Sequence, residues 1–189
     1  MTDVINGVSR KGLFDAIDAM SADASLAQFN FRIENEWVDG GLNRSVVRDF
    51  YGVKQDHTHA KPFTLYNDEP PVLLSGDQGP NPVENLLHAL AGCLVTSIVY
   101  HAAARGMKIN AVRTRFEGDL DLRGLLGITK TCRNGYREIR VTFDIEGDLT
   151  PEQKRELMAM GPEYSPVYDV VSNGTRVLCA LKEDVAAAA

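Results

Sequence analysis

Apolar residues recur at three- and four-residue spacing from Asn81 to Gly106, and this is the strongest hydrophobic pattern in the chain. The spacing predicts a helix whose two ends are clearly marked. Asn81 is a good N-cap, Pro82 suits the first helical position, and Glu84 stands where a capping box needs a carboxylate. Gly106 is typical of a helix end. One stripe of this helix would consist of Leu86, Leu87, Leu90, Leu94, Ile98 and Ala102.

The other faces of the predicted helix are apolar too. They carry Ala89, Gly92, Val95 and Val99. At about 1.5 Å per residue such a helix is too long for the small core of a 189-residue chain to cover on every side, so we expect a partner subunit. A membrane span is rejected, because four polar residues leave the apolar run short of the roughly 20 residues that cross a bilayer. They are Asn85, His88, His101 and Arg105.

Strand patterns lie on both sides of the helix. Residues 29–40 and 43–53 flank an Asp39-Gly40-Gly41 turn and predict a hairpin, and residues 62–74 form another extended stretch that is broken by prolines. After the helix, residues 109–122 and 136–149 alternate at period two around a glycine-rich connection. These strands are of the antiparallel type.

Shorter helices complete the predicted order. An amphipathic helix near the N-terminus places Leu13, Ile17 and Met20 on one face. A second helix starts at Thr150 and runs through Met160, and a short one begins near Ser165. Residues 175–183 predict a final strand. Strands, a long helix, more strands and further helices in this order indicate an α+β fold rather than a doubly wound parallel sheet.

The composition is that of a soluble globular protein. The chain has a net charge of −6 and 44% hydrophobic residues, and it shows no cluster of Lys and Arg that would favour nucleic-acid binding. The N-terminus lacks the layout of a secretion signal. Three widely spaced cysteines form neither a disulfide framework nor a paired metal motif, so we expect a cytoplasmic protein.

The long helix and the later Pro-Val segment carry a family resemblance. Pro82, a carboxylate at Glu84, a Leu-Leu pair and Ala-x-x-Gly-Cys ending at Cys93 are followed at the right distance by Ser165-Pro166-Val167. In these features the chain resembles the OsmC/Ohr family of osmotically inducible and organic hydroperoxide resistance proteins. The likeness extends over residues 29–182, which leaves residues 1–28 as an N-terminal helical extension before an OsmC-like domain at 29–189.

The resemblance implies an intertwined homodimer in which antiparallel sheets wrap around paired central helices. It also implies that Cys93 is an attacking thiol, which becomes a sulfenic acid on a hydroperoxide and is then captured by a second thiol. A thiol among Leu and Val needs a nearby cation to ionise. In the family an arginine of the N-terminal hairpin supplies it, and here Arg44 is preferred over Arg48, which stays open.

Two positions depart from the family pattern. The supporting carboxylate of the hydroperoxide resistance branch would fall at Val83, so Glu84, nine residues from Cys93 and on the opposite side of the helix, is expected to cap the helix instead. Ser165 stands where the family has its capturing cysteine, and it would be an excellent N-cap. Arg48, Glu84 and Ser165 remain candidate binding residues beside the catalytic pair Cys93 and Arg44.

Another thiol must therefore resolve an oxidised Cys93. Cys179 shares a predicted core face with Val177 and Leu181. Cys132 lies in a predicted loop between Lys130 and Arg133, two cations that favour its thiolate. A small cellular thiol could serve equally well.

Metal and cofactor chemistry find little support in the sequence. His57 and His59 share a strand face close to Asp56, but a zinc site needs about three or four ligands and no third ligand is evident. We expect no metal and no cofactor.

Two functions follow. One is a thiol peroxidase acting on an organic hydroperoxide with a thiol reductant, and the apolar helix favours fatty or aryl substrates. The other is a dimer without turnover that binds or senses a small hydrophobic or oxidised ligand. A hydrolase is weaker, since no Gly-x-Ser-x-Gly elbow is present.

Overall fold

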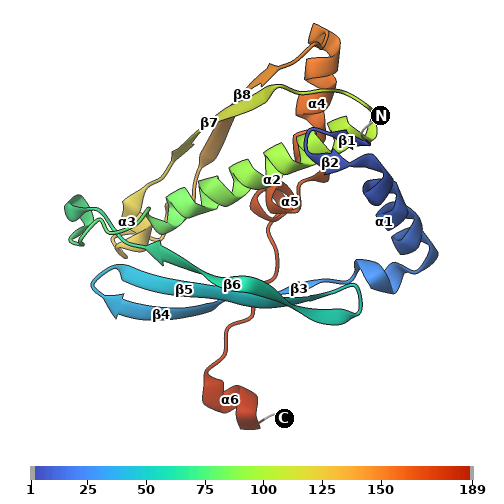
Figure 1. Ribbon diagram of the computed structural model, residues 1–189. Helices are drawn as coiled ribbons and strands as arrows, with labels where there is room; N and C mark the ends of the chain where they lie inside the picture. The colour runs from blue at the N-terminus through green and yellow to red at the C-terminus, as the bar shows by residue number, and fades with distance from the viewer. Residues whose placement is uncertain (1–2, 188–189) are drawn as a thin grey trace.

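The long predicted helix forms as α2, Pro82–Ala104, and the other elements lie around it (Figure 1). The computed structural model describes residues 3–187. The Asn81 side chain accepts a hydrogen bond from Val83 N, and the carboxylate of Glu84 accepts one from Asn81 N at 2.8 Å. The predicted capping box is therefore confirmed, and it holds the helix start that leads into the family motif.

One stripe of α2 is buried within the chain. It contains Leu90, Leu94, Ile98, Ala102 and Ala103. Among residues 3–187, α2 is the one helix long and apolar enough to cross a bilayer by length and composition. This is weak evidence for a membrane span, because the core helix of a soluble protein has the same properties.

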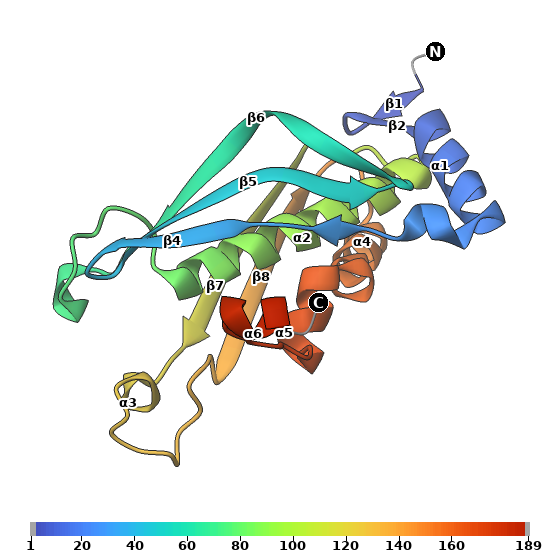
Figure 2. The ribbon, with the colours of Figure 1, turned by 90° about the horizontal axis from the view of Figure 1, so that it is seen from below.

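An antiparallel sheet lies on one side of α2 (Figures 1 and 2). Its strands are β3, Asn30–Phe31, β4, Glu34–Asp39, β5, Leu42–Gly52, and β6, Gln55–Asn67. β3 and β4 pair with one edge of β5 and β6 pairs with the other. The predicted hairpin is confirmed, and Gly40 takes the positive φ of 52° that its turn requires.

β6 is longer than the sequence predicted. It begins at Gln55 instead of Pro62, and its pairing with β5 shifts between Val47 and Asp49. Phe63 pairs with Val47 and Thr58 with Asp49, so Pro62 falls within the irregular segment where β6 has no paired residues. A proline is tolerated there because it has no N–H to give to the ladder.

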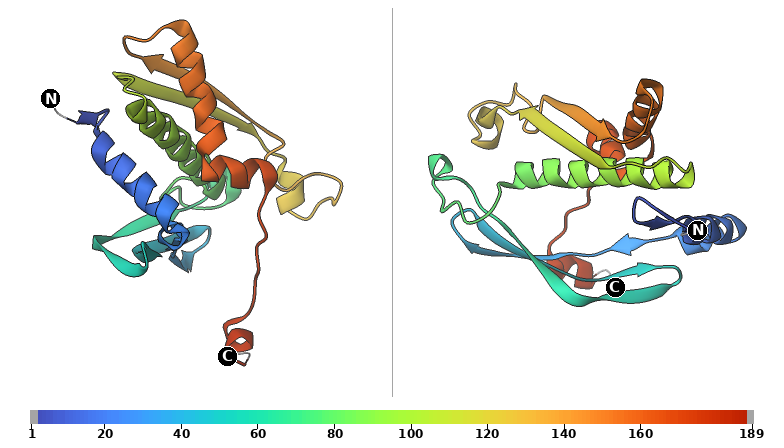
Figure 3. Two further views of the ribbon diagram at one scale, coloured as in Figure 1. Left: turned by 90° about the vertical axis from the view of Figure 1, so that its right-hand side faces the viewer. Right: turned by 45° about the horizontal axis from the view of Figure 1, so that its top comes forward.

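A two-stranded antiparallel ribbon covers the other side of α2 (Figure 3, right). β7, Ala111–Asp119, pairs along its whole length with β8, Glu138–Glu146. The predicted connection contains a short helix, α3, Leu122–Leu125. The predicted strand pair is confirmed, and with the first sheet it makes the fold α+β.

The core is formed by α2, β8 and α4, Pro151–Tyr164. Its buried residues are Ile98, Ala102, Ile145, Leu157 and Met160. Gly161 of α4 faces Leu94 and Ile98 of α2, and a Cβ built on it would lie 3.4 Å from their side-chain carbons, which is a close van der Waals contact. α5, Pro166–Asn173, follows α4 and also contacts α2.

The N-terminal segment contacts the C-terminal end of α2 and the residues that follow it. It comprises β1, Val4–Ile5, β2, Val8–Ser9, α1, Arg10–Ala22, and a 3-10 turn at Ala24–Ala27. Asn6 donates to the carbonyl of Met107 and accepts from Ile109 N at 2.9 Å. Arg10 donates to the carbonyl of Ala104. The amphipathic helix predicted here is confirmed.

The predicted final strand is wrong. Residues 174–181 form no regular structure and lead to α6, Lys182–Ala187. The segment runs away from the helices (Figure 3, left). An alternating apolar pattern becomes a strand only where a sheet edge accepts it, and this segment pairs with no strand of residues 3–187. The core position predicted for Cys179 is therefore also wrong, because that thiol is exposed and Val177 is 75% exposed.

Candidate functional site

Cys93 lies near the middle of α2 beside the buried stripe of that helix. Its side chain is half-buried between the levels of Leu90 and Leu94, which are 3% and 1% exposed. The carbonyl of Cys93 accepts a hydrogen bond from Ser97 Oγ at 2.9 Å, in addition to its place in the helix. Cys93, Cys132 and Cys179 are all free thiols. Cys93 is thus a partly accessible thiol on a rigid, apolar element.

Arg44 lies on β5, and the strand register shows which way it points. Asn43 pairs with Asn67, whose side chain accepts a hydrogen bond from Asn85 of α2, so this face of the sheet looks toward α2. Neighbouring residues of a strand point to opposite faces. Arg44 therefore points away from α2, and its guanidinium pairs with Glu36.

Arg48, the second candidate cation, also has an acidic partner on β4. Its Nε lies 4.0 Å from a carboxylate oxygen of Glu34, and both side chains are more than half exposed. A surface pair of this kind adds little to stability. Within one chain, the structure joins each of the two hairpin arginines to an acidic residue of β4 and neither of them to Cys93.

Glu84 lies at the start of α2, where its carboxylate caps the helix. Tyr136, which precedes β8, donates its hydroxyl to the carbonyl of Val83 at 3.1 Å. Burial, and then the negative charge of Glu84, raise the pKa of Tyr136. The first turn of α2 is therefore tied to the β7–β8 ribbon.

Ser165 joins α4 to α5 and is 2% exposed. Its Oγ accepts a hydrogen bond from Tyr168 N at 3.1 Å, so it serves as the N-cap of α5. The predicted capping geometry is confirmed. This hydroxyl is engaged with the backbone of its own helix.

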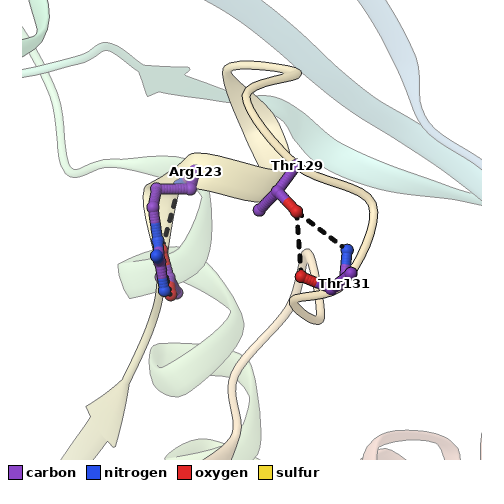
Figure 4. Close-up of polar contacts among 4 residues, drawn as sticks. Arg123, Thr129 and Thr131 are labelled. Atoms are coloured by element: carbon purple, nitrogen blue, oxygen red, sulfur yellow. Dashed lines mark hydrogen bonds and ion pairs between the residues drawn. The ribbon is translucent and has the colours of Figure 1, made fainter.

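Cys132 lies in the loop between α3 and β8 and is half-buried. It lines a cavity of about 580 Å³ together with Lys130 and Arg133. In this loop Thr131 N donates to Thr129 Oγ1, and the two threonine hydroxyls share a further hydrogen bond (Figure 4). At the start of α3, Arg123 pairs with Asp121. A hydrogen bond from Arg123 lowers the pKa of Asp121 to about 2. The loop predicted around Cys132 is confirmed, and its cations are near the thiol.

The two strand histidines belong to an aromatic cluster. The rings of Phe50 and His57 are stacked, with 4.9 Å between their centroids. Phe50 also contacts His59, whose ring lies edge-on to that of Phe63 with 5.0 Å between the centroids. His57 Nε2 is also 3.1 Å from the carbonyl of Gly52. Within residues 3–187, no three His, Cys, Asp or Glu side chains are grouped so that they could hold a metal ion.

A cavity of about 500 Å³ opens between α2, β8 and α5, and the sequence did not reveal it. Leu86 and Leu90 of α2 form part of its wall. Cys93 lies seven and three residues beyond them, on the same face of the helix. Arg133, Arg137 and Tyr168 are among its polar lining residues. Arg133 and Arg137 belong to the segment before β8, whereas Tyr168 is on α5 and the leucines are on α2, so no local spacing links the whole set.

Comparison with known proteins gives a family match for the segment that contains these residues. Residues 75–179 match the family model of OsmC-like proteins, and this segment contains Cys93, Ser165 and the cavity walls. No curated protein is similar enough in sequence to count as a relative.

Solved structures share the fold. An OsmC-like protein from Mycoplasma pneumoniae is 16% identical, with a TM-score of 0.59 over 76% of this chain and 87% of its own. A putative osmotic stress induced and detoxification response protein from Psychrobacter arcticus is 12% identical, with a TM-score of 0.55 over 72% of this chain and 85% of its own. Identities this low show a common fold alone.

Proposed function

Because this chain belongs to the family of OsmC-like proteins, we propose that it reduces organic hydroperoxides with Cys93 as the attacking thiolate. The observation that carries the proposal is the half-buried Cys93 thiol at the centre of the family-matched helix, beside apolar side chains. Such surroundings suit a fatty or aryl hydroperoxide better than hydrogen peroxide, since apolar lining favours apolar ligands.

The proposed reaction has two stages. The thiolate sulfur attacks the outer oxygen of the hydroperoxide, the O–O bond breaks, and the alkoxide leaves and takes up a proton to form the alcohol. Cys93 becomes a sulfenic acid. One thiol then displaces water to form a mixed disulfide with Cys93, and a second thiol restores the Cys93 thiol and leaves as a disulfide. Each turnover therefore consumes one hydroperoxide and two thiols.

An external thiol is the proposed resolving group. Ser165 replaces the family's second cysteine, and its hydroxyl caps α5. Cys179 and Cys132 remain candidates, and Cys132 has cations close by, which favour a thiolate.

Arg44 is proposed to stabilise the thiolate, with Arg48 as the alternative. For this role the Arg44 guanidinium would have to leave its ion pair with Glu36 and approach the Cys93 sulfur. A side chain that points away from its own α2 would serve Cys93 only through a rearrangement of the hairpin or through a partner subunit. Comparing Arg44→Gln with Arg48→Gln for the rate of Cys93 alkylation at neutral pH decides between them, because loss of the cation that stabilises the thiolate slows alkylation.

A homodimer in the cytoplasm is the proposed assembly, with residues 1–28 as an extension and 29–189 as the OsmC-like domain. Support comes from large apolar side chains that one chain leaves uncovered on the first sheet. Phe31 and Trp37 are 75% and 70% exposed, and the Phe31 ring lies against those of Phe29 and Phe50, with Phe29 43% exposed. Clustered exposed apolar side chains of this kind mark interaction sites. Membrane and nucleic-acid partners are not proposed.

The test is peroxide consumption by the purified full chain. Cumene hydroperoxide with excess dithiothreitol should be consumed over many turnovers by the parent, and Cys93→Ser should reduce the rate to that of the buffer. Cys132→Ser and Cys179→Ser serve as matched controls, and each should keep the parent rate if the external thiol resolves Cys93. Oxidation of a single equivalent would instead favour the alternative, a binding or sensing dimer without turnover, which the buried Ser165 cap also favours.

A further inference from the structure

The cavity between α2, β8 and α5 has an apolar floor. Leu86 and Leu90 contribute the α2 side, Ile139 and Val141 the β8 side, and Val170 and Val171 the α5 side. Its volume of about 500 Å³ falls within the range of natural small-molecule sites, roughly 300–1,000 Å³. Two helices, one strand and the loop before β8 all contribute to it, so its shape does not depend on one segment.

Two guanidinium groups lie at the same cavity. Arg133 and Arg137 both line it, and neither forms an ion pair with any of residues 3–187. Two carboxylates are close to them, because Glu138 also lines the cavity and Glu84, which caps α2, acts on the lining residue Tyr136. Arg140 pairs with Asp119 and with Glu138 at 2.6 Å.

The third acidic residue of this region is also paired. Asp121 bonds to Arg123 at 2.6 Å. Residues 119–140 carry five basic and three acidic side chains, in a chain whose net charge is −6. The surplus positive charge is therefore concentrated at the rim of an apolar cavity.

We propose that this cavity binds an amphipathic carboxylate. The carboxylate lies against Arg133 and Arg137, because a guanidinium presents paired N–H donors that match two carboxylate oxygens. The hydrocarbon chain lies on the floor and points along α2 from Leu86 toward Leu90. This site does not depend on the proposed peroxidase activity, since Cys93 is not among the residues that line it.

Titration calorimetry with sodium octanoate and with 1-octanol tests the proposal on the full chain. Octanoate should bind, and 1-octanol should bind at least about tenfold more weakly, because it lacks the charge-assisted hydrogen bonds. The double variant Arg133→Gln/Arg137→Gln should bind octanoate no better than octanol. Octanoate binding should also weaken as salt is added.

Three further variants complete the design. Arg115→Gln removes an exposed arginine of β7 outside the cavity and should keep the parent affinity. Val170→Asp places a negative charge at an exposed lining residue and should abolish octanoate binding without disturbing the core. Cys93→Ser should bind octanoate like the parent, so failure of this proposal is distinguishable from failure of the peroxidase.

The proposal is overturned by equal affinities for octanoate and octanol, or by an Arg115→Gln variant as weak as the double variant. It is also overturned if no binding is detected, which is the result expected if side chains of a partner subunit fill the cavity.

Discussion

Asp68 is a buried carboxylate that organises the loop leading to α2. It is 0% exposed, and its oxygens accept hydrogen bonds from Ser75 Oγ, from Gln78 N at 2.9 Å and from Glu69 N at 2.8 Å. Ser75 Oγ in turn accepts from Gly41 N in the β4–β5 turn. One side chain therefore links the first hairpin to the segment before the long helix.

These hydrogen bonds lower the pKa of Asp68, and the one from Ser75 has the largest effect. A carboxyl whose pKa is lower in the folded state than in the unfolded state stabilises the fold above the unfolded pKa of about 3.9, and this contribution is lost as pH falls through the folded pKa. Asp68→Asn should thus be less stable than the parent at neutral pH and should lose less stability on acidification.

Urea unfolding at neutral pH and near pH 3 measures both effects for Asp68→Asn. Asp18→Asn, an exposed carboxylate of α1, is the matched control and should follow the parent. If Asp68→Asn loses as much stability on acidification as the parent does, the carboxylate does not have this role.

At the scale of elements, the helix starts depend on hydroxyl caps that can be compared directly. Ser165 Oγ caps α5 and Thr150 Oγ1 caps α4, where it accepts from Gln153 N at 3.2 Å. Ser165→Ala and Thr150→Ala should each lower the free energy of unfolding by about 1 kcal/mol.

Activity separates a cap from a catalytic group at Ser165. If Ser165 only starts α5, Ser165→Ala should retain the parent rate of peroxide consumption per folded molecule, as Thr150→Ala does. A selective loss of rate in Ser165→Ala, with stability equal to that of Thr150→Ala, would give the hydroxyl a chemical role.

At the scale of the whole molecule, α2 presents an open face. Gly92 is exposed, and a Cβ built on it meets no heavy atom within 4 Å. Thr96 and Tyr100 continue this face at four-residue spacing and are also exposed. The part of the chain that the structure describes covers only one stripe of an apolar helix, which agrees with the homodimer proposed above.

Gly92→Leu tests that assembly. A larger side chain fits the single chain and replaces a poor helix former, a gain of up to about 1 kcal/mol for the isolated helix. In a dimer packed on this face it should clash, so sedimentation velocity should show a shift from dimer to monomer. Ala16→Leu, on an exposed position of α1, should leave the mass unchanged. A parent protein that sediments as a monomer would refute the dimer.

Several features could be predicted from the sequence, because interactions between residues close in the chain control them. Asn81, Pro82 and Glu84 start α2 through contacts within one turn, and the Asp39-Gly40 turn sets the first hairpin. The alternation of apolar and polar residues at period two was enough to predict β7 and β8 as strands. The family motif on α2 was also readable, because its residues are neighbours along one helix.

The features that depend on contacts between distant segments could not be predicted and became visible in the folded chain. The register of β5 turned Arg44 away from α2, and the absence of a sheet edge for residues 174–181 left them without strand pairing. Asp68 is buried with its hydrogen bonds satisfied because the chain returns and places Ser75 Oγ and Gln78 N within reach of its carboxylate. The cavity with Arg137 exists because three separate elements pack together. Such contacts form between residues far apart in the chain, and no local pattern encodes them.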